Sequence, residues 1–361
     1  MKPGQIIAWI RIFFEGVIRM KQIQKVICIL GLILLILDSR TASAGIRDGI
    51  ELCLEAVIPS IFPFLVICSL LTSLEFSFLS RFLQPIRKVC GIPVGAENIF
   101  ILGFLSGYPT GAQIINQAWL SGRLEKKDAN RMLGFCSNAG PSFIFGICSM
   151  YLPTSKIWLL WLIHILSAII TAFLLPGKTN HLAKPQPPLN TSLPDAIKKS
   201  SSTMAIICAW IVMFRMFLVF SKKWFHRFLS PDTFCFLCGL LELTNGIFIL
   251  DHSYPQGKLF IYMATFLAFG GLCVAAQTCS VTKQLGLGYY FPGKTMQSAI
   301  SFLLSYLTQF FFFAQKELWK LSDIYLFIPL LWIIFMYVCL RYKKTVAFPR
   351  QLMYNKAKIS T

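Results

Sequence analysis

Long apolar runs separated by short polar or basic stretches dominate the chain. The runs at residues 22 to 38, 157 to 175, 196 to 220, 258 to 278, 296 to 313 and 324 to 340 are mostly apolar. A helix needs about 20 such residues to cross the hydrocarbon core of a membrane. We therefore expect membrane spans at these places, with further apolar helices between them.

Three other apolar segments contain residues that break helices. Residues 46 to 74, 97 to 119 and 128 to 151 are interrupted by Pro59, Pro63, Gly107, Pro109, Gly111, Gly140 and Pro141. Proline removes a backbone donor, and irregular backbone at membrane depth is tolerated only inside the protein or around a cavity. We expect each of these segments to be a broken or re-entrant helix.

A polar stretch rich in proline divides the chain into two halves with similar features. Gly103 and Gly134 open two glycine-rich segments 31 residues apart, and Gly239 and Gly270 do the same in the second half. Paired repeats are common in transporters. The predicted fold is all-α, a polytopic membrane protein with broken helices in two inverted repeats. Its expected parts are an N-terminal amphipathic helix and first span (1–45), a first repeat (46–175), a polar linker (176–195), a second repeat (196–340) and a basic tail (341–361).

Composition and charge support a membrane protein. Hydrophobic residues make up 56% of the chain and charged residues 14%, which excludes an ordinary soluble domain. The net charge of +19 comes from Lys and Arg at both ends and between the apolar runs, the pattern of cytoplasmic loops and not of a nucleic-acid-binding face. We expect both termini in the cytoplasm and the protein in a bacterial cytoplasmic membrane. A secretory signal ending near residues 41 to 44 is the alternative.

The sequence carries no motif for enzymatic or metal chemistry. Twelve cysteines lie mostly in apolar runs, and Cys235 and Cys238 form a C-x-x-C with no second pair or nearby histidine. Hydrolase, zinc-protease and phosphate-binding signatures are missing. We expect no enzyme activity, no cofactor and no metal site. The basic residues Arg123, Lys126, Lys127 and Arg131 are expected on a solvated cytoplasmic stretch.

Polar residues beside the breaks in the first half are candidates for solute binding. They are Ser106, Tyr108 and Thr110 in the first break, and Asn138 and Ser142 in the second. Proline and glycine free backbone groups that become ligands when they line a cavity. The alternatives are kinks that pack helices closely and an asparagine that caps a helix.

In the second half, Glu242 lies alone in an apolar run and is followed by Thr244 and Asn245. An acid inside a membrane is costly and marks a functional site by default, with cation coupling, proton transfer or solute binding as its roles. A structural partner such as Arg215 is the alternative. Gln277 and Thr278 form the polar edge of the last broken segment.

The motifs GFLSGYPTGA, NAGPSF, GLLELTNG and FGGLCVAAQT resemble those of the YlbJ family of sporulation integral membrane proteins, also called SpoVV. That family carries a nucleoside-recognition Gate domain and is related to concentrative nucleoside transporters. The resemblance implies two Gate-like repeats and a place in the outer forespore membrane. It also implies a role in moving dipicolinic acid, with Ser106, Thr110, Asn138, Ser142, Glu242, Asn245 and Gln277 as the matching candidates for solute contact.

Three functions follow from these observations. The first is a carrier or facilitator for a small polar or anionic solute, such as dipicolinic acid or a nucleoside-like molecule, with membrane lipid and a coupling cation as further partners. The second is a membrane scaffold of spore assembly that transports nothing. The third, a membrane enzyme, has only scattered polar residues in its favour.

Overall fold

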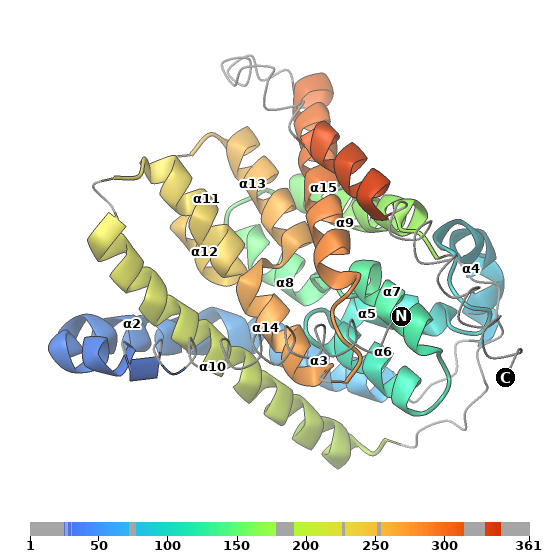
Figure 1. Cartoon of the computed structure of the whole chain (residues 1–361), viewed down its shortest axis with the longest axis horizontal. Helices are drawn as coiled ribbons and strands as arrows, with labels where there is room; N and C mark the ends of the chain where they lie inside the picture. The colour runs from blue at the N-terminus through green and yellow to red at the C-terminus, as the bar shows by residue number, and fades with distance from the viewer. Residues whose placement is uncertain are drawn as a thin grey trace, which may run out of the picture.

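Every regular element in the described part of the chain is a helix, as the apolar runs predict (Figure 1). The computed structural model describes residues 25, 28–29, 31–71, 77–177, 191–225, 228–250, 254–282, 284–313 and 329–340. Four of the described helical segments have the length and apolar composition to cross a membrane. These are Ser39–Leu71, Thr154–Leu174, Leu193–Phe225 and Gln256–Val281.

The prediction of a broken helix over residues 46 to 74 is wrong. Helix α2 (Ser39–Leu52), a π-helical turn (Cys53–Val57) and α3 (Ile58–Leu71) run on as one helix. Pro63 lies inside α3. A π turn widens the helix by one residue per turn, and such turns are a known way to accommodate local distortion without ending the helix.

The span expected over residues 258 to 278 is interrupted. Helix α13 (Gln256–Phe269) ends at Gly270, which has a φ of 82°, and α14 (Gly271–Val281) follows directly. Glycine adopts this left-handed conformation without steric cost, and the helix therefore turns there. The expected spans at 157 to 175 and 196 to 220 are confirmed as α9 (Thr154–Leu174) and α10 (Leu193–Phe225).

The order of elements recurs along the chain. A 33-residue helical segment (Ser39–Leu71), two broken helices and α9 are followed by α10, also of 33 residues, two broken helices and α15 (Tyr290–Phe313). The broken helices are α5–α6 (Glu97–Ser106, Thr110–Leu120), α7–α8 (Lys126–Cys136, Pro141–Gly146), α11–α12 (Pro231–Leu241, Leu243–Ile249) and α13–α14. Helix α4 (Ser77–Cys90) and the 3-10 turn Cys148–Met150 are extra elements of the first half.

The two halves pack reciprocally. Helix α10 crosses α2 and α3, and α9 packs against α15 (Figure 1). Helix α7 contacts α15 of the other half, and α13 contacts α9 in return. Such an exchange is expected of two repeats related by a pseudo-two-fold axis. Opposite membrane orientation of the halves, and the domain boundaries, stay predictions.

The glycines that are 31 residues apart in each half do not occupy equivalent positions in the two halves. Gly103 and Gly239 both lie one turn before a break, in α5 and α11. Gly134, however, lies inside α7 and packs on Gly293 of α15, whereas Gly270 is itself a break. The recurring element order therefore supports duplication, and the 31-residue spacing does not.

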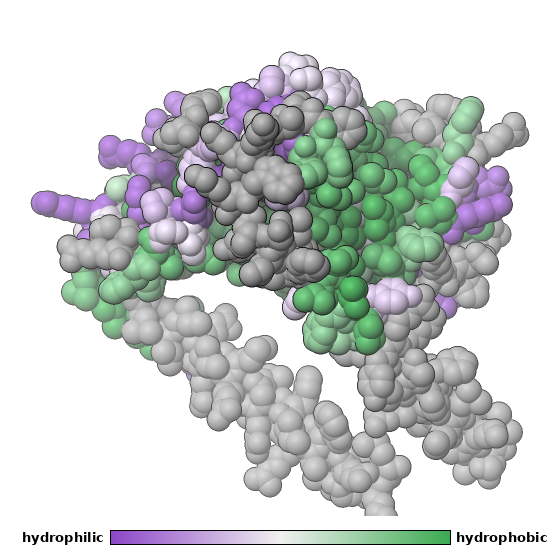
Figure 2. Space-filling view, turned by 90° about the horizontal axis from the view of Figure 1, so that it is seen from above, coloured by the Kyte–Doolittle hydropathy of each residue, from purple (hydrophilic) through white to green (hydrophobic). Residues whose placement is uncertain are grey.

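In the face shown in Figure 2 a broad apolar area lies between hydrophilic residues at its two edges. On α9, Trp158, Leu162 and Leu166 point outward with 56%, 59% and 42% exposure. Because these residues share one face at helical spacing, α9 presents an apolar stripe suited to lipid.

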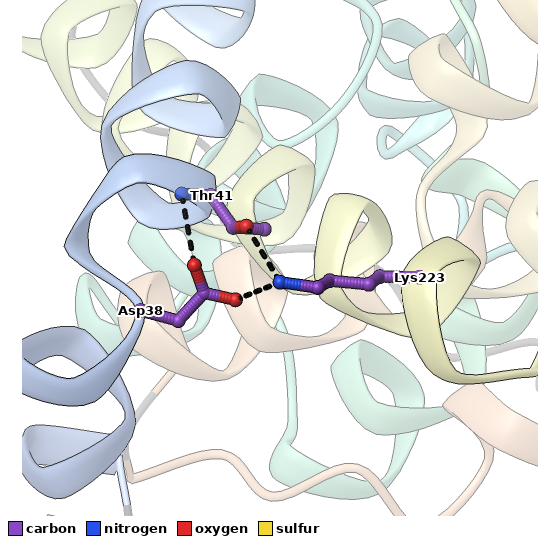
Figure 3. A network of polar contacts seen from close by, with 3 residues as sticks. All are labelled: Asp38, Thr41 and Lys223. Atoms are coloured by element: carbon purple, nitrogen blue, oxygen red, sulfur yellow. Dashed lines mark hydrogen bonds and ion pairs between the residues drawn. The ribbon is translucent and has the colours of Figure 1, made fainter.

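A polar contact joins the start of α2 to the end of α10 (Figure 3). Asp38 accepts a hydrogen bond from the backbone nitrogen of Thr41 at 3.4 Å and forms an ion pair with Lys223. Lys223 also donates to the Thr41 hydroxyl at 3.3 Å. The hydrogen bond from Lys223 lowers the pKa of the Asp38 carboxyl, so both the cap of α2 and its link to α10 involve this carboxylate.

Candidate functional site

The breaks in α5–α6 and α7–α8 lie against each other. Gly107 has a φ of 71° and precedes a cis Tyr108–Pro109 bond. A methyl group on Gly107 would lie 2.9 Å from the backbone nitrogen of Gly140, so the two backbones touch. Any residue with a side chain would push them apart. The first and second breaks are therefore in direct backbone contact.

The other two breaks join the same centre. A methyl group on Gly271 would lie 3.4 Å from the Cα of Glu242, which is the break residue of α11–α12. One on Gly270 would meet the Tyr108 ring at 3.1 Å. Tyr108 donates a hydrogen bond to the Leu267 carbonyl at 2.9 Å, which ties the first break to the end of α13. Four helix interruptions from both halves thus surround one place.

A small cavity of about 40 Å³ lies at this centre. Polar side chains from all four broken helices and apolar ones from α3 and α10 line it. The volume is far below the roughly 300 Å³ or more of ordinary small-molecule pockets, so the centre is closed to a ring-sized solute in this conformation. Its lining includes Ser106, Gly107, Tyr108, Gly140, Ser142, Ile207, Ile211, Glu242, Thr244 and Gln277.

Glu242 caps α12 from inside the protein. Its side chain is 2% exposed; one oxygen accepts from the Thr244 nitrogen at 3.0 Å and the other from the Asn245 nitrogen at 2.6 Å. The Asn245 side-chain amide donates to the same second oxygen at 2.7 Å. Three donors directed at one carboxyl group, with the positive end of a helix behind them, favour a carboxylate.

Arg215 does not contact Glu242 directly. Its guanidinium donates to the side-chain oxygen of Asn245 at 3.0 Å and lies 3.5 Å from Asp48 of α2. None of the ion pairs among the described residues includes Glu242. The alternative in which Arg215 directly neutralises the acid is therefore wrong, and Asn245 stands between the two groups.

Lys294 of α15 is a second buried charged residue at the centre. It is 0% exposed, and its ammonium donates to Asn138 at 3.0 Å, Gln297 at 2.8 Å and the Tyr108 hydroxyl at 3.4 Å. It also lies 5.2 Å from the centre of the Tyr108 ring, a cation–π distance. Asn138 is thus held by α15, since Gln297 also donates to it at 2.9 Å.

A larger charged cleft borders the central cavity. It measures about 360 Å³ and lies where α6, α10 and α14 meet, with Lys198, Lys199 and Asp195 among its lining. Pro109 and Ile206 line the cleft, and their neighbours Tyr108 and Ile207 line the cavity. One layer of the first break and α10 therefore separates the two spaces.

Comparison with known proteins finds a relative of this chain. The chain is similar to the sporulation integral membrane protein YlbJ of Bacillus subtilis strain 168, with 23% identity over 301 residues, 70% of this chain and 73% of the relative. This similarity supports membership of the YlbJ family. No family model matches the chain, and no solved structure matches it. An integral membrane protein of sporulation fits both the match and the apolar helices.

The structure brings together only some of the solute-binding candidates that the YlbJ resemblance and the helix breaks indicated. Six line the cavity, namely Ser106, Tyr108, Ser142, Glu242, Thr244 and Gln277. Asn245 lies one contact away, bound to Glu242, and Asn138 is linked to the lining through Lys294 and Tyr108. Thr110 and Thr278 are buried but are not among the residues that line it.

Lys294 and Gln297 were not among the site residues expected from the sequence of this YlbJ-like chain. A signal for them exists, because polar residues recur at helical spacing along α15 and all are 0% exposed. That stripe comprises Lys294, Gln297, Ser301, Ser305 and Gln309.

The expectation of a solvated Arg131 is wrong. Its side chain is 2% exposed and donates to five backbone carbonyl groups at the ends of α4 and α9. Helix C-termini leave carbonyls without partners and carry partial negative charge. Arg131 is therefore a structural cation that joins two helix ends to α7.

Proposed function

We propose that this protein is a carrier or facilitator for a small polar or anionic solute. The observation that carries the proposal is the meeting of four helix interruptions at one buried polar cavity, flanked by Glu242 and Lys294. Broken helices at the interface of two repeats are a common way to build a solute site within a membrane. Two charged groups buried there add cost that a purely structural core avoids.

The closed cavity and the open cleft support alternating access. A cavity of about 40 Å³ does not hold a ring-sized solute, whereas the adjacent cleft of about 360 Å³ is large enough to admit one. Movement of the Tyr108–Pro109 turn against α10 would join the two spaces. In this arrangement the cleft is an entry vestibule, and its lysines favour anionic solutes.

Dipicolinic acid, moved across the outer forespore membrane, is the first solute to test, because the YlbJ resemblance implies it. A nucleoside such as uridine is the second, from the implied relation to nucleoside transporters. The test is uptake of each radiolabelled solute into vesicles that hold the purified full-length chain. We expect uptake of at least one solute above that of empty vesicles.

Matched variants of α14 sharpen this test. Gln277→Leu removes a polar group from the cavity lining, and Ser280→Leu makes a similar change one turn away, outside it. We expect the first to lower uptake and the second to leave it near the parent value at equal protein abundance. Folded protein that takes up neither solute would instead favour the scaffold function.

Glu242 is the candidate for cation coupling. An anion does not sit beside an uncompensated carboxylate, so a cation or a proton must accompany it there. Glu242→Gln should change the dependence of uptake on pH or sodium before it abolishes folding. Identical uptake by variant and parent across pH and sodium concentrations would reduce Glu242 to a structural acid.

A further inference from the structure

The ammonium of Lys294 is buried among neutral acceptors. Its partners are two amide oxygens and a phenol, and none of the ion pairs among the described residues includes it. The partners come from three elements, namely the first break, the second break and α15 itself. A buried cation without a counter-charge is costly, and a nearby anion removes much of that cost.

Arg131 shows what a purely structural buried cation looks like in the same fold. The hydrogen bonds of its guanidinium go to backbone carbonyls at helix ends, which need a donor and cannot move away from it. The partners of Lys294 are side chains of Tyr108, Asn138 and Gln297, and the Tyr108 contact is long at 3.4 Å. Side-chain partners can rotate away when a stronger acceptor arrives, so the Lys294 contacts are exchangeable.

Lys294 does not line the solute cavity itself but lies one side chain behind its wall. Tyr108, which contacts Lys294, lines the cavity, and Glu242 lines it from the α11–α12 break. Among the described residues no ion pair joins the two groups, so the acid in the cavity wall and the lysine behind that wall do not neutralise each other directly. An anionic group of a solute is stable only on the basic side.

We propose that Lys294 is the anion-recognition group of the carrier, and that a carboxylate of the solute replaces Tyr108 and Asn138 as its acceptor. This rests on the proposed function, and it makes Lys294 the residue that selects anionic over neutral solutes. The exchange also removes the contact of Lys294 with Tyr108 and leaves Tyr108 with its hydrogen bond to the Leu267 carbonyl. Binding of an anion therefore removes one of the contacts that hold Tyr108 in the closed centre.

The test compares matched pairs of anionic and neutral probes on the full-length chain in detergent micelles. The pairs are benzoate with benzamide, pyridine-2-carboxylate with its amide, and pyridine-2,6-dicarboxylate with its diamide. Equilibrium dialysis gives the affinity of the parent and of Lys294→Met, which keeps the bulk of the side chain without charge. Lys156→Met is the control, because Lys156 is buried too, at 6% exposure, but binds Gln256, away from the cavity lining.

We expect the parent to bind at least one carboxylate more tightly than its amide. Lys294→Met should lose about ten- to hundred-fold in that affinity, the range for a lost hydrogen bond between charged groups, and leave amide binding unchanged. Lys156→Met should behave as the parent. A parent with no preference for any carboxylate overturns the inference, as does an equal loss for carboxylate and amide in Lys294→Met, which would mark a structural role.

Uptake by the same proteins in vesicles separates this inference from the proposed function. Charge-selective binding that depends on Lys294, without accumulation of any probe, would leave the anion site standing and refute transport. Uptake of the probes without a preference for the charged member of each pair would support transport and refute the anion site.

Discussion

Replacing Glu242 by glutamine keeps the size of the side chain but exchanges one acceptor oxygen for an amide donor. In the structure both carboxylate oxygens accept, one from the Thr244 nitrogen at 3.0 Å and one from two nitrogens of Asn245 at 2.6 and 2.7 Å. Whichever way the new amide turns, its NH₂ group faces at least one N–H. At least one hydrogen bond is therefore lost in a buried place.

The expected cost is about 1.5–3 kcal/mol, the range for a buried hydrogen bond to a charged group. The cost lies at the upper end of this range if the new NH₂ group faces Asn245, because two donors then lose their acceptor. Denaturant titration of the full-length chain in micelles measures this change in the free energy of unfolding. A change below about 0.5 kcal/mol, the scatter typical of neutral substitutions, would refute the reasoning, because it would mean that Glu242 carries a proton and already behaves as an amide.

A double-mutant cycle isolates the contact with Asn245. We expect Glu242→Gln and Asn245→Ala to be non-additive by about 0.5–3 kcal/mol, the range for residues in one hydrogen-bond network. Thr265→Val is the control partner, since the Thr265 hydroxyl donates to Ile261 within its own helix at 2.7 Å. Additivity in both cycles would remove the Glu242–Asn245 contact as an energetic unit.

Three further substitutions test the packing and the polar links of the fold by the same unfolding measurement. Gly103→Ala places a methyl group 2.2 Å from a carbonyl oxygen of α7 and should destabilise by about 1–3 kcal/mol or more, whereas Gly31→Ala, with nothing within 4 Å, should not. The hydrogen bond from Lys223 lowers the pKa of the Asp38 carboxyl. The carboxylate therefore stabilises the fold at pH values above its ordinary pKa, and this contribution is lost as the pH falls through the lowered pKa. Asp38→Asn should remove this acid dependence and should be as stable as the parent at the lowest pH. Arg131→Lys should cost at least about 2 kcal/mol, because an ammonium cannot reach all five carbonyls, and an unchanged midpoint would contradict this role.

The positions of the helix breaks were predictable where two breakers coincide with polar residues. Gly107 with Pro109, and Gly140 with Pro141, interrupt their helices as expected. Pro59 and Pro63 do not, because the helix around them absorbs the disturbance in a π turn. A proline therefore predicts a break only when a glycine beside it allows the backbone to leave the helix, and Gly107 with its positive φ provides this.

The meeting of the breaks and the acid Glu242 beside them were predictable in part, whereas the pairing of Lys294 with Asn138 was not. Close approach of Gly107 and Gly140 follows from the requirement that irregular backbone be enclosed by protein. Which other helix faces that centre depends on the crossing of α15 with α7 and α9, a tertiary contact between segments more than 100 residues apart. Asn138, selected from the sequence as a solute-binding candidate, is fully buried, and its partner Lys294 follows only from that crossing.

Charge alone misassigned Arg131 and did not single out Lys294, but the spacing of polar residues on α15 would have identified Lys294 as buried. Lys294 looks like one more cation at the end of an apolar run, as Lys126 does. Yet Lys294 begins a stripe with Gln297, Ser301 and Ser305 at intervals of three and four, which places all of them on one face of the helix. A polar face on an otherwise apolar helix cannot turn toward lipid, so it turns inward and takes the lysine with it. The same period therefore predicts both the burial of Lys294 and the side of α15 on which an anion would have to bind.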